Sequence, residues 1–282
     1  LAYTGTPFAE TVIGRPRLGV KTGCNEAFIV VAAVANGERD GTAAHQRSHE
    51  SVREAVLTTI TSGTRSGSVE SHMLRPLIRG DSARSWIVDR SEEMIIWTHD
   101  PDGGPMRSPP PYVKKWLGAW RGDLERRSDS KRDGRWWQLF RTESASPASP
   151  RVVWADIGRN PRAAVLMAGD PAVALNTCYV AQCRDNFDAF ALTALINSPV
   201  IAAWLGLIAE PARGGYRRFL GWTMSLLPLP ADWARARRIM APVCERAIAG
   251  MPPTDAALVA ATLDAFRLGE SEIAPLMRWN GR

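Results

Sequence analysis

Cysteine and lysine are scarce in this chain, which has only four of each among its 282 residues. Four cysteines are too few for a disulfide scaffold in a sequence this long, so we expect reduced thiols and a cytoplasmic location. The formal net charge of +6 rests mainly on 31 arginines, whose guanidinium groups match phosphate and guanine. An apolar content of 45% argues against long disorder and predicts a globular protein with one large core or two smaller ones.

Catalytic motifs are missing or incomplete. There is no G-x-S-x-G nucleophile elbow and no F-x-G-x-G loop of the kind that holds S-adenosylmethionine. Residues 14–22 (GRPRLGVKT) resemble a phosphate-binding loop, but Val20 separates Gly19 from Lys21. Residues 108–112 (SPPPY) resemble the motif of amino-methyltransferases that bind a flipped base, but with one extra proline. We therefore expect no catalytic residue and no cofactor in this chain.

Histidine and cysteine spacing predicts no metal site. His45 and His49 lie four residues apart, but they lack the glutamate of H-E-x-x-H and a pair of cysteine ligands. Cys178 and Cys183 fall in a predicted strand and are interpreted as structural thiols. The chain begins at Leu1 without a leader peptide, which favours a mature or excised piece.

One charge-free run is long enough to span a bilayer. It covers residues 189–209, but Asn197, Ser198 and Pro199 interrupt its centre. Proline disfavours a helical residue before it, so this run predicts two buried helices and no contact with a membrane.

The remaining patterns predict an α+β fold. Strands are expected at residues 28–34, 86–88, 94–98, 151–157, 163–168 and 178–183. One helix is expected over residues 113–124, because its apolar residues share a face, and two more over residues 232–249 and 254–268, the last capped by Thr254. Residues 36–72 form a long polar insertion with a helical patch near 50–60. We expect a recognition domain over residues 1–230 and a helical extension over 231–282.

Positive charge is concentrated between residues 107 and 141. Ten basic and four acidic residues there give +6, equal to the excess of the whole chain. This segment is either a solvated helix face or a stripe that binds phosphates. The adjacent Trp136 and Trp137 belong either to the core or to a surface that stacks on bases.

Six phrases, in order, resemble one protein family. They are LGVKTGCNEAFI (18–29), LRPLIRG (74–80), residues 112–127 with WWQL (136–139), RVVWADI (151–157), LINS (195–198) and LPLP (227–230). The family is the C-terminal target-recognition domain of TaqI-like adenine-N6 DNA methyltransferases and type IIG restriction–modification enzymes. The resemblance covers roughly residues 15–230, and the insertion at 36–72 departs from the family pattern.

The resemblance implies a DNA reader separated from its catalyst. In such enzymes an upstream N-terminal methyltransferase domain binds S-adenosylmethionine and methylates a flipped adenine, while the recognition domain reads double-stranded DNA. Two alternatives stay open. One is a divergent methyltransferase that uses Ser108–Tyr112, and the other is a protein-interaction scaffold of a multi-subunit complex.

Ten residues are candidates for DNA contact. They are Lys21, Arg79, Lys114, Lys115, Arg121, Arg126, Arg213, Tyr216, Arg217 and Arg218. The loop at 213–218 is the candidate for base reading, because two glycines let the backbone approach and arginine bonds guanine in the major groove. The lysines and arginines of 114–126 are expected on the exposed helix face, where they would contact phosphate. For Arg79, a salt bridge and a phosphate contact are equally compatible with the sequence.

Overall fold

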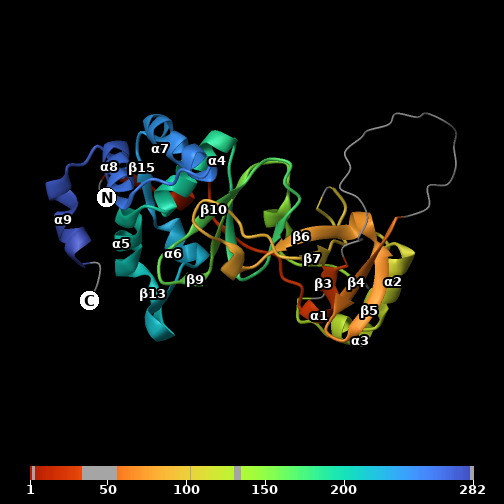
Figure 1. Cartoon of the computed structure of the whole chain (residues 1–282). Helices are drawn as coiled ribbons and strands as arrows, with labels where there is room; N and C mark the ends of the chain where they lie inside the picture. The colour runs from red at the N-terminus through yellow and green to blue at the C-terminus, as the bar shows by residue number, and fades with distance from the viewer. Residues whose placement is uncertain (2–3, 34–55, 102, 130–134, 280–282) are drawn as a thin grey trace, which may run out of the picture. The chain divides into compact units, whose positions relative to one another are not determined.

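The structure, a computed structural model, describes residues 1, 4–33, 56–101, 103–129 and 135–279 (Figure 1). Its helices and sheets confirm the α+β class. Residue contacts divide the chain into two compact units. Unit 1 contains Leu1–Lys21, Leu77–Ser91 and Phe140–Arg282, and unit 2 contains Thr22–Pro76 and Glu92–Leu139. The chain therefore crosses from one unit to the other four times.

A four-stranded antiparallel sheet, in the order β10-β8-β12-β2, forms the centre of unit 1. Its strands are β2 (Arg17–Leu18), β8 (Arg151–Ala155), β10 (Ala163–Leu166) and β12 (Cys178–Gln182). Side chains alternate between the two faces of a strand, and β8 is buried on both faces. Val152 and Trp154 pack into one cluster with the helix α4 (Asn186–Ile196), and Val153 packs into another cluster with Leu166 and Val180. β8, β10 and β12 confirm the strands predicted within residues 151–157, 163–168 and 178–183.

The helices of unit 1 include the two that were predicted from the charge-free run at residues 189–209. They are α4 (Asn186–Ile196), α5 (Pro199–Ile208), α6 (Gly221–Ser225), α7 (Trp233–Ile248), α8 (Asp255–Phe266) and α9 (Glu270–Trp279). The predicted break falls between α4 and α5, where the Ser198 hydroxyl accepts a hydrogen bond from the Val200 amide at 3.3 Å. The Asn197 amide bonds both the N–H and the C=O of Ala163 at 2.9 Å, which ties the break to β10.

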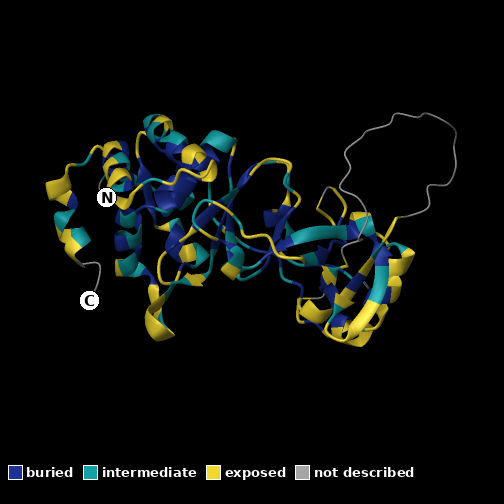
Figure 2. Cartoon of the chain, in the orientation of Figure 1, coloured by how far each residue is buried: buried dark blue, intermediate teal, exposed yellow. Residues whose placement is uncertain are grey.

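α4 is almost entirely buried and α5 buries one face inside unit 1, with Leu207 49% exposed, which confirms the prediction of a core element (Figure 2). Among the described residues, no single helix is long and apolar enough to cross a membrane. The pair α4 and α5 would qualify together by length and composition, although a bend of 67° separates them. The expected cap of α8 is also confirmed, because the Thr254 hydroxyl accepts from the Ala257 amide at 3.2 Å.

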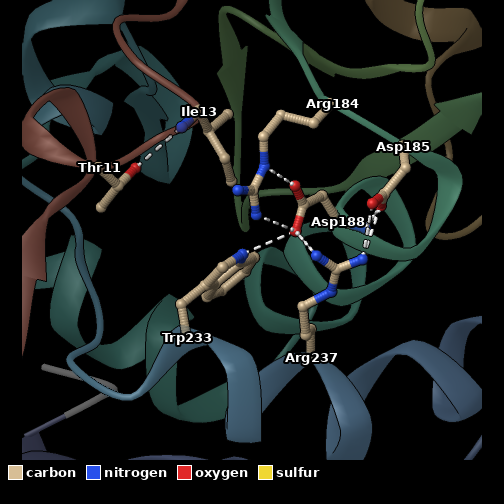
Figure 3. Close-up of polar contacts among 7 residues, drawn as sticks. All are labelled: Thr11, Ile13, Arg184, Asp185, Asp188, Trp233 and Arg237. Atoms are coloured by element: carbon tan, nitrogen blue, oxygen red, sulfur yellow. Dashed lines mark hydrogen bonds and ion pairs between the residues drawn. The ribbon is translucent and has the colours of Figure 1, made fainter.

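A buried carboxylate joins α4 to α7 (Figure 3). Asp188 is fully buried and accepts hydrogen bonds from Arg184 Nε at 2.7 Å and from Trp233 Nε1 at 2.8 Å. Arg237 of α7 lies 3.1 Å from the same carboxylate and also pairs with Asp185, the N-cap of α4. The charge of Asp188 is therefore compensated by Arg184, just before α4, and by Arg237 of α7, as a buried ion requires.

Short strands complete unit 1. They are β1 (Gly5–Pro7), β9 (Ile157–Gly158), β11 (Val173–Ala174), β13 (Glu210–Ala212), β14 (Tyr216–Arg218) and β15 (Pro228–Pro230). β1 pairs with β15, and β13, β14 and β9 form a three-stranded sheet. β11 runs parallel to Leu77 and Ile78, the last residues of β6 (Leu74–Ile78).

Unit 2 is an antiparallel sheet with short helices. Its strands are β3 (Ile29–Ala32), β4 (Leu57–Ser62), β5 (Arg65–Glu70), β7 (Glu93–Ile96) and the first residues of β6 (Leu74–Ile78), and its helices are α1 (Asn25–Phe28), α2 (Pro111–Gly118) and α3 (Arg121–Glu125). The order along the sheet is β6-β7-β3-β4-β5. The buried Glu70 carboxylate accepts from the amides of Tyr112 and Val113 at 3.0 Å, so β5 caps the N-terminus of α2.

Three expectations about local structure are wrong. The helical patch near 50–60 is a strand from Leu57 onward, because Thr58, Thr59 and Ile60 are β-branched, and residues 50–55 lie outside the described residues. The helix expected over 113–124 is two helices, which separate after Gly118, a weak helix former. Residues 86–88 form only isolated bridges. The helix α9 was not predicted.

The predicted boundary after residue 230 stays a prediction. The extension is helical, as expected, and α7 to α9 belong to unit 1 together with the central sheet. The boundary that the contacts define runs elsewhere, because unit 2 is assembled from two separate stretches of the chain.

Candidate nucleic-acid interface

A pocket of about 540 Å³ in unit 1 is bordered by four guanidinium groups. Two of its walls are loops: residues 79–84, which follow β6, and residues 156–162, which connect β8 through β9 to β10. We call it the arginine pocket. Its charged and aromatic lining residues are Arg79, Arg84, Arg159, Arg162, Asp81, Asp156 and Tyr216.

Backbone hydrogen bonds fix the walls of the arginine pocket. The Gly80 amide donates to Thr177 Oγ1 at 3.0 Å, and the Asp156 amide donates to the Thr177 carbonyl at 3.0 Å. The Phe219 amide donates to the Asp156 carbonyl at 2.8 Å, which attaches the strand β14 to the end of β8. The side chains that line the pocket therefore project from a constrained backbone, which lowers the entropy lost when a ligand binds.

Charge in the arginine pocket is positive by two units, from four arginines and two aspartates. Burial raises the pKa of the Asp156 carboxyl, and the nearby Arg218 acts in the opposite direction. Arg84 forms an exposed ion pair with Asp89 at 2.8 Å. Arg159 and Arg162 form no ion pair within the described part of the chain, and Arg159 lies 5.5 Å from the centre of the Tyr216 ring. These two guanidinium groups keep N–H donors for an anionic ligand.

The hairpin β13–β14 is mostly exposed (Figure 2), and Tyr216 of β14 lines the pocket. Its turn contains Gly214 and Gly215 at φ values of +75° and +76°, a region that favours glycine. Arg213 and Arg218 are exposed, and Arg217 is half-buried, with its guanidinium donating to the Ala209 carbonyl at 3.3 Å. The hairpin thus carries arginines on a narrow ribbon with a compact turn, a shape that fits the major groove.

A second basic face lies on α2 and α3 of unit 2. Lys114 and Lys115 are exposed and form no ion pair with any described residue. Arg121 pairs with Glu125 at 2.8 Å, and Arg126 pairs with Asp123 at 2.6 Å. The two lysines are therefore available to phosphate, and the two arginines are already partnered on the surface, where such pairs contribute little to stability.

Arg127 belongs to the interior of unit 2. It donates to the backbone carbonyls of Thr22, Leu124 and Trp136, and burial lowers the pKa of its guanidinium to about 10. Trp136 is buried, and the indole of Trp137 donates to the Met106 carbonyl at 3.0 Å. These contacts favour the core interpretation of the tryptophan pair.

The structure brings five of the ten predicted residues to one region of unit 1. Arg79 and Tyr216 line the arginine pocket, while Arg213, Arg217 and Arg218 lie on the adjoining hairpin. Lys21 is not among the lining residues, and its backbone pairs with that of Phe140. The other four lie in unit 2. Arg84, Arg159 and Arg162 were missed, although two arginines with Gly158 and Pro161 between two predicted strands are a recognisable loop signal.

The incomplete motifs have structural roles. Pro111 and Tyr112 begin α2 under the Glu70 cap, and the Ser108 hydroxyl donates to the Pro109 carbonyl at 3.4 Å. Cys178 and Cys183 are free and buried, which agrees with their interpretation as structural thiols. This burial raises the pKa of the Cys178 thiol to about 12 and also raises that of Cys183. No group of three or more metal-binding side chains occurs among the described residues, and His45 and His49 lie outside them.

Neither a protein-family model nor a curated protein matches this sequence. Among solved structures, the chain is similar to the Type IIL restriction–modification enzyme MmeI in complex with DNA. The TM-score is 0.48 and the sequence identity is 12%. The match covers 75% of this chain and 29% of that enzyme, so this chain spans less than a third of its length.

Proposed function

We propose that this chain is a sequence-specific reader of double-stranded DNA in a restriction–modification system. The observation that carries the proposal is the grouping of arginines from three distant parts of the sequence. Residues 79–84, 159–162 and 213–218 converge on the arginine pocket and its hairpin. Guanidinium groups on a protruding ribbon supply donors both for phosphate and for the O6 and N7 atoms of guanine.

The finer proposal concerns the parent protein. The six ordered phrases resemble the recognition domain of adenine-N6 methyltransferases, so we propose a cytoplasmic parent whose N-terminal domain binds S-adenosylmethionine. The arginine pocket would contribute recognition and no chemistry. Within that assignment, the hairpin reads base edges, and the lysines of α2 contact phosphates.

The decisive experiment is binding of the full chain to a random-sequence duplex pool across a salt titration. We expect the logarithm of the binding constant to fall steeply with the logarithm of salt concentration, and one short motif to be enriched in the bound pool. Salt-dependent binding without an enriched motif would show a non-specific cation surface and would contradict the proposal.

A second candidate, the protein-interaction scaffold, has one observation in its favour. An apolar pocket of about 790 Å³ in unit 1 includes Ile87, Met167 and Ile248 among its lining, and all three are more than a third exposed. Exposed apolar side chains of this kind occur at protein interfaces. Tight, salt-insensitive binding of another protein with no affinity for DNA would favour the scaffold over the DNA reader.

A further inference from the structure

A second pocket of unit 1, of about 810 Å³, combines three guanidinium groups with an exposed indole. We call it the Trp222 pocket. Its charged and aromatic lining residues are Glu10, Arg15, Arg17, Arg141, Glu143, Tyr179 and Trp222. None of these residues lines the arginine pocket. The volume of the Trp222 pocket lies within the range of about 300–1,000 Å³ that is common for small-molecule sites.

The indole of Trp222 is exposed to solvent, which is unusual for so large an apolar ring. Trp222 is 51% exposed, and Leu226, one turn along and just beyond α6, is 53% exposed. The helix itself is firmly seated, because a Cβ atom on Gly221 would lie 2.7 Å from Cε1 of Tyr179. The Ser225 hydroxyl also donates to the Gly221 carbonyl at 2.6 Å. Trp222 is thus a flat apolar surface on a fixed support.

The three guanidinium groups come from equally well-defined backbone. Arg17 lies in β2, paired with Val180 of β12. Arg15 follows a turn in which the Gly14 amide donates to the Thr11 carbonyl at 3.0 Å, and the Thr11 hydroxyl accepts from the Ile13 amide (Figure 3). Arg141 adopts a left-handed conformation at φ +58°, next to Phe140.

These guanidinium groups have no charge partner within the part of the chain that the structure describes. All three arginines are exposed, and Glu10 and Glu143, which also line the pocket, form no ion pair with them among the described residues. Three arginines and two glutamates leave one positive charge. The segment GRPRLGVKT therefore places two guanidinium groups, those of Arg15 and Arg17, at this pocket with N–H donors suited to an anion.

We propose that the Trp222 pocket binds a nucleotide whose base is not paired. The indole would stack on the base, the arginines would bind its 5′-phosphate, and a glutamate would accept a hydrogen bond from an exocyclic amino group. The combination of an aromatic platform and guanidinium groups matches the chemistry of single-stranded nucleic-acid sites. An unpaired nucleotide within a DNA strand and a free mononucleotide share this chemistry. The proposal does not depend on the arginine pocket.

The test is a competition experiment with the full chain and a fluorescently labelled single-stranded tetranucleotide. The competitors are dAMP, inorganic phosphate and a blunt duplex. We expect Trp222→Ala to weaken tetranucleotide binding at least about fivefold and Trp222→Phe to retain most of it. Met251→Ala, which removes an exposed apolar side chain that does not line this pocket, should leave binding nearly unchanged. Arg17→Ala should also weaken binding, and thermal melts establish that each variant is folded.

The competitors separate the two sources of the nucleotide. Competition by dAMP as strong as that by the tetranucleotide would identify a free mononucleotide, and much stronger competition by the tetranucleotide would identify a DNA strand. The proposal is overturned if the tetranucleotide does not bind, or if only the duplex competes with it. It is also overturned if inorganic phosphate competes as well as dAMP and Trp222→Ala does not change the affinity. Arg217→Ala should impair duplex recognition without changing tetranucleotide affinity, so failure of one proposal is distinguishable from failure of the other.

Discussion

Arg217 lies opposite Gly158 in the antiparallel pairing of β14 with β9. Because glycine has no side chain, Arg217 meets no cross-strand side chain on the β9 side, whereas Pro211 of β13 lies opposite it on the other side. Its hydrogen bond to the Ala209 carbonyl uses one of five N–H donors. Arg217 is thus oriented by the hairpin and retains donors for a base edge.

Replacing Arg217 with alanine should relax the sequence preference of DNA binding. We expect a loss of about 1–3 kcal/mol for the preferred duplex and a smaller loss for other sequences, because a bidentate contact with guanine would disappear. The measurement is a comparison of selected and scrambled duplexes by fluorescence anisotropy. An equal loss for all sequences would assign Arg217 to phosphate contact.

Replacing Lys115 with alanine should weaken binding to every duplex about equally. The lysine is exposed on α2 without an ion pair among the described residues, so its removal should lower the salt slope by about one. Arg121→Ala is the matched control, because Glu125 already partners Arg121 on the neighbouring helix. A larger effect from Arg121 than from Lys115 would contradict the assignment.

Replacing Asp156 with asparagine should tighten DNA binding and stabilise the protein at neutral pH. Burial raises the pKa of this carboxyl in the folded state, so its contribution to stability is present at low pH and is lost as pH rises through the raised pKa. The neutral amide of asparagine removes the free-energy cost of burying a charged carboxylate, and it removes one negative charge near Arg218. We expect a gain of about 1 kcal/mol in DNA affinity at low salt, measured by anisotropy. Weaker binding would show that Asp156 contacts a base directly.

Acid should destabilise unit 2 through His99. Its ring accepts a hydrogen bond from the Leu139 amide at Nε2 and lies 3.0 Å from the Gly103 carbonyl at Nδ1, as one neutral tautomer requires. Burial lowers the pKa of His99 below 6.5, so its stabilising contribution is complete above pH 6.5 and is lost as pH falls through the lowered value. The melting temperature should therefore fall more between about pH 6.5 and 5 in the native chain than in His99→Gln.

Replacing Asp188 with alanine should destabilise the chain by about 3–5 kcal/mol, because Arg237 and the Trp233 indole would lose a buried partner. Asp123→Ala, which removes an exposed pair with Arg126, should cost under about 1 kcal/mol. Urea denaturation measures both. Equal losses of unfolding free energy would show that the buried ion pair of Asp188 stabilises the protein no more than the exposed pair of Asp123.

Local signals in the sequence predicted much of the local structure. Pro199 after Ser198 and Thr254 after two prolines each mark a helix start, because cap residues act within one turn. The helix break after Gly118 was missed, because the apolar stripe runs on through the break to Leu124.

The candidate site was harder to predict, because its parts meet only in three dimensions. The sequence singled out Arg79 and Tyr216 separately, but no spacing relates them to Arg159. Arg127 was grouped with surface charge, although it donates to the nearby Leu124 and Trp136 carbonyls and to the Thr22 carbonyl, 105 residues away in the sequence. Pairing of this kind depends on the tertiary fold and leaves no periodic signal.

The fourfold crossing of the chain between its units has a consequence for exchanging recognition modules between proteins. Unit 2 is encoded in two stretches, Thr22–Pro76 and Glu92–Leu139, with Leu77–Ser91 of unit 1 between them. In a chimera with a single crossover between the two stretches, β3 and its antiparallel partner β7 would come from different proteins. A crossover at the junction after Pro76 would also divide β6. Transplanting unit 2 therefore requires both stretches to be replaced together as one cassette, with four splice points that leave β6 intact.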